Sequence, residues 1–396
     1  MDATGVSDVP AAGQQWGLES FPRTEFGPGV VSRLPEFVAD LGHRRAFVVT
    51  DECLRATGMV DRIRESLELA GMECAVHDGV GANPSTAQID RGAAAARAFG
   101  DCAVVAVGGG SPLDAGKAIS LLAGSPDATA ADADAVLAGI GGLPVIAVPT
   151  TSGTGAETNG FGVIEDTCAK RKVYIGHSSV VPRIAVLDPE LTLTLPARVT
   201  AATGIDALVH GVESLSARGA NAVSVAYAGH AVTLVSRWLP VAYRDGADLD
   251  ARAQLMLGAH LAGRALTISG LGLVHGIGHA VTAHTGTPHG IALAAVFEEV
   301  MDFNAPSAVT AYEHAARAMR AGPAGAASDV DWPAAARAAV REVSGAVDVK
   351  RPLGALGVHR DLVPAVVDAA ISDPVTRNNP RTASEHNVRR IVESVL

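Results

Sequence analysis

Short apolar runs alternate with longer amphipathic stretches through the first half of the chain, beginning with a turn and helix at 26–42. The apolar runs are rich in Val, Ile and Ala and end in Gly, Thr or Asp, which is typical of buried strands. They cover 44–52, 73–80, 102–111, 143–157 and 184–192. Because strands alternate with helices, the pattern predicts a doubly wound, parallel, Rossmann-like α/β sheet.

Beyond Pro196 the pattern changes to alanine-rich amphipathic stretches without strand-like runs between them. These stretches predict helices over 199–237, 249–268, 291–301, 308–320, 333–343, 361–372 and 384–396. A chain of 396 residues suits two domains. We therefore predict an α/β domain over residues 1–195 and an all-α domain over residues 196–396.

Composition narrows the class of protein. The chain is 48 % apolar, but it has no apolar run of the roughly 18 residues that a membrane span requires. Its first residues lack the basic and apolar segments of a signal peptide. Four cysteines without a C-x-x-C pair indicate a reduced, cytoplasmic compartment. The net charge of −11, with no basic block, argues against nucleic acid and anionic membrane as partners.

The segment 270–290 concentrates four histidines, among them His275 and His279 at a helical i, i+4 spacing. Asp206 and His210 repeat this spacing, so each pair can point at one atom from one helix face. Imidazole and carboxylate are ligands for Fe²⁺ or Zn²⁺. The pattern suggests a mononuclear metal site, although Asp206 as a helix cap beside a surface His210 is an equal alternative for that pair alone.

Two loops of small residues follow strands of the predicted sheet. Gly108–Ser111 lies between a buried strand and a helix, where glycines admit a ligand and the helix N-terminus favours phosphate. Thr150–Gly155 follows the next strand, and open α/β sheets bind nucleotides at such strand ends. Asp51 ends an earlier strand, where it can bind a ribose 2′-hydroxyl; capping the next helix is an equal alternative.

Taken together, these motifs resemble the iron-containing alcohol dehydrogenase family. The segments that carry the resemblance are VVAVGGGSPLDAGKAI, IAVPTTSGTGAE, VLDPELTLTLPARVTAATGIDALVHGVE, GLVHGIGHA and GTPHG, in this order. The similarity runs from about Phe26 to the C-terminal NNPR. It implies a cytoplasmic oxidoreductase that transfers hydride between NAD(H) and a small primary alcohol or aldehyde. It also implies a homodimer or a larger even homo-oligomer.

The resemblance assigns the metal site residue by residue. Asp206, His210, His275 and His289 match the family's ligands to Fe²⁺ or Zn²⁺. His279 matches a histidine near the metal that does not ligate it. We take His279 as the candidate for proton transfer, and structural support of the site is the alternative interpretation.

The resemblance also assigns cofactor and substrate contacts. The positions that match contacts to NAD are Gly108, Gly109, Gly110, Ser111, Thr150, Thr151, Thr154 and Lys172. Asp51 matches the ribose carboxylate associated with NAD rather than NADP. Phe161 and Leu266 fall where substrate-pocket side chains are expected, which predicts an apolar pocket. We expect the active site in a cleft between the two domains.

Three other functions remain open. A lyase of the dehydroquinate synthase type would use NAD only transiently, but it needs clustered Lys and Arg for a polyanion, and residues around the histidines are apolar. A reductase of an acidic or phosphonate-bearing aldehyde would need a basic residue, for which Arg264 is the candidate. A degenerate, non-enzymatic member would bind neither metal nor NAD.

Three further features are open in the sequence. Glu213, one turn beyond His210, is either an orienting partner of a ligand histidine or a solvated or core-paired carboxylate. Lys117 is either a cofactor contact or a surface charge. Asn378–Arg381 is interpreted as a turn that ends a helix.

Overall fold

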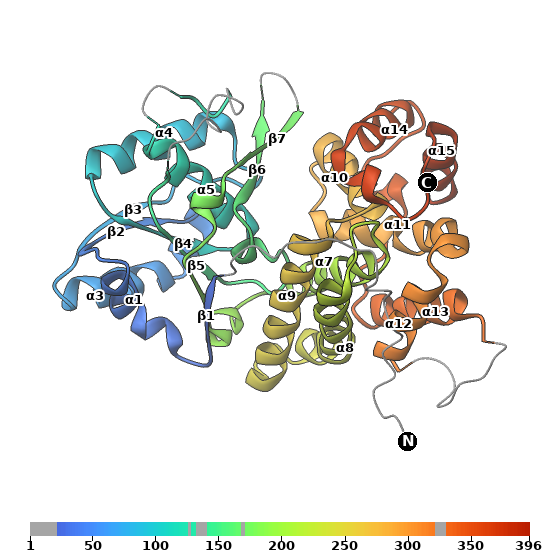
Figure 1. The fold of residues 1–396 in the computed structure, drawn as a ribbon, viewed down its shortest axis with the longest axis horizontal. Helices are drawn as coiled ribbons and strands as arrows, with labels where there is room; N and C mark the ends of the chain where they lie inside the picture. Colours follow the sequence, from blue (N-terminus) through green and yellow to red (C-terminus); the bar gives the residue numbers. More distant parts are fainter. Residues whose placement is uncertain (1–21, 126–127, 132–140, 168–170, 321–329) are drawn as a thin grey trace. The chain divides into compact units, whose positions relative to one another are not determined.

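The computed structural model describes residues 22–125, 128–131, 141–167, 171–320 and 330–396. Its backbone contacts divide the chain into two compact units, one over Ser20–Thr194 and one that includes Leu195–Leu396. Figure 1 shows the α/β unit in blue to green and the helical unit in yellow-green to red. The assignment of a cofactor to the first and a metal to the second remains a prediction.

The α/β unit is built on a six-stranded sheet in which every strand pair is parallel. The strands are β1 (Arg23–Phe26), β2 (Arg45–Val49), β3 (Glu73–His77), β4 (Ala103–Gly108), β5 (Val145–Pro149) and β8 (Ile184–Leu187). Their order is β1-β8-β5-β4-β2-β3, which confirms the predicted parallel sheet. Strand β1 was not predicted, because the regular pattern in the sequence begins only at Phe26.

The strand order reverses between β2 and β4. From β2 the chain crosses outward to β3, and it then returns to pair β4 with the other edge of β2 before moving on to β5. In open α/β sheets, ligands bind beside the carboxyl ends of the strands at such a reversal. Asp51 and Gly108 lie at those ends, so the topology brings two predicted cofactor residues to adjacent strands.

Helices cover both faces of this sheet because its strand residues alternate. Val48 packs in a cluster with α1 (Leu34–Asp40) and α3 (Met59–Leu69). Its neighbour Phe47 packs on the opposite face with α4 (Thr86–Phe99) and α5 (Gly110–Ala123). A strand buried on both faces reads as a continuous apolar run, which is the pattern seen in the sequence.

A two-stranded antiparallel hairpin, β6 (Phe161–Asp166) with β7 (Arg171–Gly176), is also present. The sequence interpretation contained no hairpin and passed from 143–157 directly to the strand at 184–192. Each strand has six residues and mixes apolar with charged positions, so neither stands out as a buried run. One face is nevertheless buried through Ile164, Val173 and Ile175.

The helical unit contains only helices among its described residues, as predicted. They are α7 (Ala197–Ser216), α8 (Ala222–Arg244), α9 (Leu249–Ser269), α10 (Leu273–Thr285), α11 (His289–Asn304), α12 (Val309–Ala318), α13 (Trp332–Ala346), α14 (Val363–Ser372) and α15 (Glu385–Ser394). The stretch 199–237, predicted without a break, is divided between α7 and α8. Asn221 ends the intervening turn by accepting hydrogen bonds from the amides of Val223 and Ser224, which starts α8.

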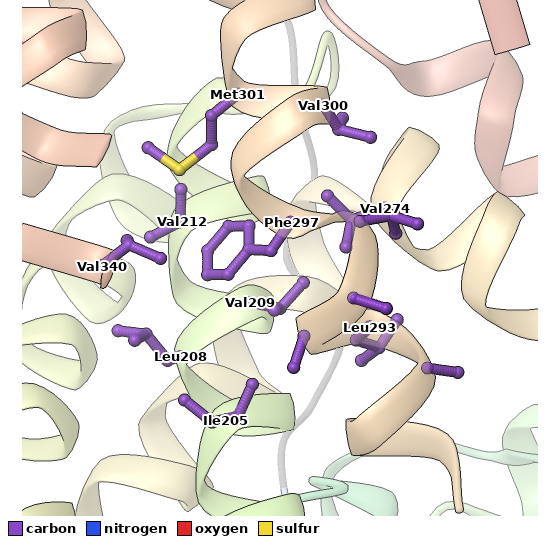
Figure 2. Packing of buried hydrophobic residues seen from close by; sticks show 14 of the residues in the cluster. Ile205, Leu208, Val209, Val212, Val274, Leu293, Phe297, Val300, Met301 and Val340 are labelled. Atoms are coloured by element: carbon purple, nitrogen blue, oxygen red, sulfur yellow. The ribbon is translucent and has the colours of Figure 1, made fainter. Parts of the chain in front are cut away.

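Helix α7 is buried on two faces, one apolar and one polar. Ile205, Leu208 and Val212 lie one turn apart and pack in the apolar core with α11 and α13 (Figure 2). Asp206, His210 and Glu213 are likewise about one turn apart, on a neighbouring stripe of the helix, and all three are buried. A helix buried on both sides therefore places a polar stripe inside the unit.

No single helix in the described ranges is long and apolar enough to cross a membrane. Helices α9 and α10 pass that test only as a pair, and they are bent by 105° at the break between them.

Candidate functional site

Three of the four predicted ligands are histidines that lie around a carboxylate oxygen of the fourth, Asp206, in the helical unit. From Asp206 Oδ1, the Nε2 atoms of His210, His275 and His289 lie at 3.3, 3.4 and 3.8 Å. Metal–ligand bonds of about 2.0–2.2 Å in a tetrahedron separate the ligand atoms by about 3.3–3.6 Å. The ligand atoms of Asp206, His210 and His275 all lie within 4.8 Å of one another. Their separation has the dimensions of a metal site.

The atoms at the centre of this cluster fit a divalent cation. Asp206 Oδ1 and His275 Nε2 are both buried and have no oriented hydrogen-bond partner, although they are 3.4 Å apart. A buried polar atom without a partner is costly, and one cation would satisfy both. Three imidazoles and one carboxylate are the donor types that Fe²⁺ and Zn²⁺ accept.

The side chains of this cluster shift one another's pKa values. Burial alone would raise the pKa of Asp206, but the nearby His210 and His275 hold it well below its usual value. Burial opposes a charge on His275, but the neighbouring carboxylates of Asp206 and Glu213 raise its pKa to about 9. Partial desolvation and neighbouring imidazoles lower the pKa of His289, whose side chain is still 31 % exposed, so it is neutral at pH 7.

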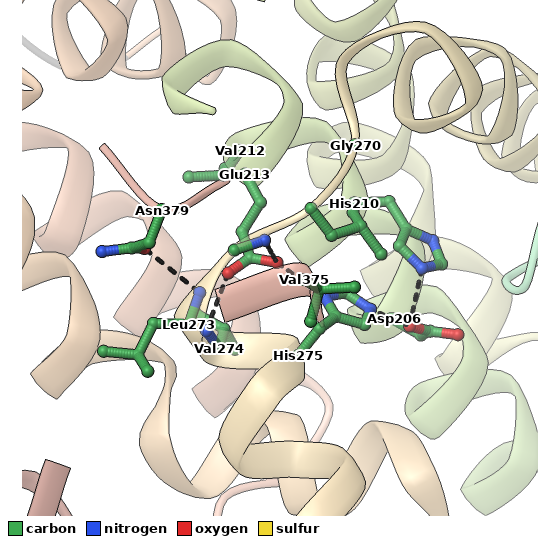
Figure 3. A network of polar contacts seen from close by, with 12 residues as sticks. Asp206, His210, Val212, Glu213, Gly270, Leu273, Val274, His275, Val375 and Asn379 are labelled. Atoms are coloured by element: carbon green, nitrogen blue, oxygen red, sulfur yellow. Dashed lines mark hydrogen bonds and ion pairs between the residues drawn. The ribbon is translucent and has the colours of Figure 1, made fainter. Parts of the chain in front are cut away.

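Glu213 contacts His275 directly. Its Oε2 lies 2.6 Å from Nδ1 of His275, on the side of the ring away from Asp206 (Figure 3). Glu213 is 4 % exposed, so it is not solvated, and its basic neighbour is His275 itself. Of the two interpretations open in the sequence, the structure supports an orienting partner.

His279 lies beside this cluster and has its own carboxylate. Its Nδ1 is 2.8 Å from Oδ2 of Asp373, and its ring stacks on His289 at 5.2 Å between centroids. Asp373 is 94 residues away in sequence and was not among the predicted residues. No local pattern could have revealed it, because only the packing of α10 against the chain after α14 brings the two together.

Close packing of α7 and α11 brings His289 to the cluster. Pro288 precedes α11 as its N-cap residue, and Gly290 is its second residue. A Cβ on Gly290 would lie 1.9 Å from the carbonyl oxygen of Ala202 on α7. Only glycine therefore allows this approach, which places His289 against Asp206.

In the α/β unit, the loop Gly108–Ser111 leads from β4 into α5. Gly109 is the N-cap residue of α5 and offers no side-chain cap, and the first turn contains no acidic residue. The positive end of the α5 dipole is therefore available to bind an anion such as a phosphate. Lys117 is not a surface charge: it is 1 % exposed, and its Nζ donates to the carbonyl of Ala156 at 2.8 Å.

The loop Thr150–Gly155 lies against this turn, because β5 is the neighbour of β4. The amide of Thr150 donates to the carbonyl of Gly108 at 2.9 Å. A Cβ on Gly110 would lie 2.9 Å from Cγ2 of Thr154, and one on Gly109 would lie 3.4 Å from Cγ2 of Thr151. The predicted cofactor loops therefore lie in contact with each other.

Asp51 caps α2 (Glu52–Ala56) by accepting a hydrogen bond from the amide of Leu54 at 2.8 Å. This observation supports the capping interpretation and leaves the ribose role as a prediction. Lys172 lies in β7 opposite Glu165, and its side chain is outside the described residues. Phe161 is 38 % exposed in the α/β unit, whereas Leu266 is 7 % exposed in the helical unit. The predicted apolar substrate pocket remains a prediction.

Comparison with known families matches both units. Residues 22–189 match the iron-containing alcohol dehydrogenase family, and residues 200–396 match the C-terminal part of the Fe-containing alcohol dehydrogenase family. The two matches together span both units and define the class of protein: this chain is an oxidoreductase.

Individual relatives agree with this class. The chain is 36 % identical over 363 residues to the probable alcohol dehydrogenase EutG of Escherichia coli K12, covering 92 % of this chain and 90 % of that one. It is 33 % identical to lactaldehyde reductase of the same organism, over 92 % and 95 % of the two chains. A crystal structure of a 1,3-propanediol oxidoreductase superposes with a TM-score of 0.90 at 33 % identity, covering 95 % and 98 %. The chain belongs to the iron-containing alcohol dehydrogenase family.

Proposed function

We propose that this oxidoreductase transfers hydride between NAD(H) and a small primary alcohol or aldehyde held at a divalent metal, Fe²⁺ or Zn²⁺. The observation that carries the proposal is the convergence of three histidine Nε2 atoms on Asp206 Oδ1 at 3.3–3.8 Å in a buried site. Related chains are named lactaldehyde reductase, NAD-dependent methanol dehydrogenase and 1,3-propanediol dehydrogenase, which supports short alcohols as substrates.

In this proposal Asp206, His210, His275 and His289 hold the metal. Bound there, the ion supplies Lewis-acid polarisation of the substrate oxygen. Asp206 is the only carboxylate among the four proposed ligands, so this ligand set would leave a divalent ion with a net positive charge.

His279 is proposed to carry the proton that leaves or enters with hydride transfer. Asp373 accepts a hydrogen bond from Nδ1, which fixes the ring and leaves Nε2 to exchange the proton. Stacking on His289 keeps the ring next to a metal ligand. The alternative, a purely structural His279, predicts that His279→Phe retains most of the turnover.

The cofactor is proposed to bind at the strand reversal of the α/β unit. The turn Gly108–Ser111 and the start of α5 would take the pyrophosphate, and Thr150, Thr151 and Thr154 would line its path. Lys172 would add a further contact. Asp51, one strand away, would accept from the ribose 2′-hydroxyl and repel a 2′-phosphate, which favours NAD over NADP.

The remaining proposals rest on family resemblance alone. Phe161 and Leu266 would contribute to an apolar substrate pocket. The enzyme would act in the cytoplasm as a homodimer or a larger even assembly.

Anaerobic purification with elemental analysis, followed by an NADH-coupled assay of short aldehydes and diols, tests the proposal. We expect about one metal per chain and net oxidation of NADH by a short aldehyde. A stable protein with bound NAD and a product formed without net change in NADH would instead indicate the transient-NAD lyase. Protein without metal, and without a melting shift on addition of NAD, would contradict both.

A further inference from the structure

The carboxylate of Glu213 receives three hydrogen bonds from one short segment. The amide of Gly272 donates to Oε2 at 3.1 Å, and the amide of Val274 donates to Oε1 at 2.7 Å. Nδ1 of His275 lies 2.6 Å from Oε2. Figure 3 shows Glu213 reaching from α7 to the start of α10, with Asp206 on the far side of the His275 ring.

The same contacts supply the cap that α10 lacks. Its N-cap residue is Gly272, which has no side chain to satisfy the first amides of the helix. Glu213 binds the amide of Val274, and Asn379 accepts from the amide of Leu273 at 3.1 Å. The two caps come from residues 61 and 106 positions away in sequence, so the helix start is held by tertiary structure.

Asn379 is itself fixed in the interior. It is 1 % exposed, and it exchanges two side-chain hydrogen bonds with Asn304 at 2.7 and 3.0 Å. Its neighbour Asn378 donates to the carbonyls of Ser269 and Leu271, on the turn before α10. The turn at 378–381, predicted only as the end of a helix, thus holds the segment that carries His275.

A carboxylate can only accept hydrogen bonds, which fixes the position of the proton on His275. Because Nδ1 must donate to Glu213, Nε2 is the ring nitrogen left to bind the proposed metal beside Asp206 Oδ1. Such an outer carboxylate also increases the basicity of a ligand imidazole. Glu213 cannot rotate away without leaving the amides of Gly272 and Val274 unsatisfied.

We propose that Glu213 is the positioning residue of the metal centre. It sets the ring orientation and tautomer of His275, and through the cap of α10 it couples metal binding to the order of residues 270–274. This inference rests on the proposed metal site but goes beyond its ligand set. Asn379 holds the same segment without touching His275.

Glu213→Gln tests the inference with little change in volume. The amide group must turn an N–H toward one of three donors, and the negative charge is lost. We expect the affinity of the metal-free protein for Co²⁺ or Zn²⁺, measured by calorimetric titration, to fall about 10–100-fold. The dissociation constant for NAD should not change.

Glu298→Gln is the matched control. Glu298 is 3 % exposed on α11 in the same unit, and it pairs with Arg341 and Lys350 rather than with a histidine. Its substitution should leave metal affinity unchanged. Asn379→Ala should lower the melting temperature of the metal-free and the loaded protein, with a smaller loss of metal affinity than Glu213→Gln.

The outcomes separate the two proposals. If the wild type and Glu213→Gln bind metal equally well, the positioning role is overturned and the proposed function is not. Wild-type protein that binds no metal would overturn the proposed function and this inference with it. If Glu213→Gln does not fold, hydrogen exchange of the wild type decides. Chelation should accelerate exchange at the amides of Gly272 and Val274, and unchanged exchange would refute the coupling.

Discussion

The two units form their candidate sites from different parts of the chain. In the α/β unit the site is mostly backbone: a glycine turn, an uncapped helix start and a loop of small residues at neighbouring strand ends. In the helical unit it consists entirely of side chains, with histidine Nε2 atoms from α7, α10 and α11 lying 3.3–3.8 Å from one buried oxygen of Asp206. A backbone site depends on the close approach of loops, whereas a side-chain site depends on the residues that hold each ligand. Substitutions should therefore affect the two sites separately and by different mechanisms.

The largest difference between the effects on the two sites is expected from His275→Ala. Removing this ligand leaves Asp206 and Glu213 buried and facing an empty space, so we expect loss of bound metal and of turnover. The affinity for NAD should be retained, since its proposed site lies in the other unit. Elemental analysis and NAD titration of the same preparation measure both. The exposed His359→Ala is the control, and full turnover of metal-free His275→Ala would contradict the assignment.

The reciprocal change is Gly110→Ala. Its methyl group would lie 2.9 Å from Cγ2 of Thr154, so the loop after β5 must shift. Overpacking of this kind costs about 1–3 kcal/mol, and if that cost falls on the conformation of the loop that binds NAD, the affinity for NAD falls about 5- to 150-fold. Metal content should stay at the wild-type level. Gly229→Ala in α8, where a Cβ meets nothing within 4 Å, should change neither quantity.

A smaller effect is expected from Asp51→Asn. Asparagine keeps the cap on Leu54 but removes the charge, so α2 should remain intact while repulsion of a 2′-phosphate is lost. The ratio of kcat/KM for NADP to that for NAD should rise about tenfold, or ~1.4 kcal/mol. The neighbouring exposed Glu52→Gln serves as the control. An unchanged ratio would leave Asp51 with its capping role only.

The smallest effect is expected away from both sites, from Glu298→Gln. Burial would raise the pKa of Glu298, but Lys350 and Arg341 lower it below its usual value. A lowered folded-state pKa stabilises the protein above the unfolded value of about 4.3, and this is lost as the pH falls through the folded value. Because both partners are partly exposed, we expect a loss of about 1 kcal/mol at pH 7. Melting curves should show this gap shrinking below about pH 4 and not changing above pH 6.

The sequence predicted what depends on local pattern. Buried runs such as that ending at Gly108 indicated the parallel sheet, and the i, i+4 spacing of Asp206 and His210 is realised on one face of α7. What the sequence analysis missed has no distinctive local pattern. The hairpin β6–β7 has no distinctive run, and the partners of His279 and of the α10 start lie 94 and 106 residues away. The sequence left two interpretations of Glu213 open, because its role depends on where its side chain lies in the folded unit.

Because α7 is buried on two faces, one helix carries part of the apolar core and part of the proposed metal site. Each residue advances the helix by about 100°, so inserting a single residue before His210 would turn Glu213 and every later side chain toward the wrong neighbours. Apolar side chains would then lie at the proposed metal site, and carboxylates would lie in the apolar core. A one-residue insertion in α7 would therefore disturb the proposed metal site and the apolar core together.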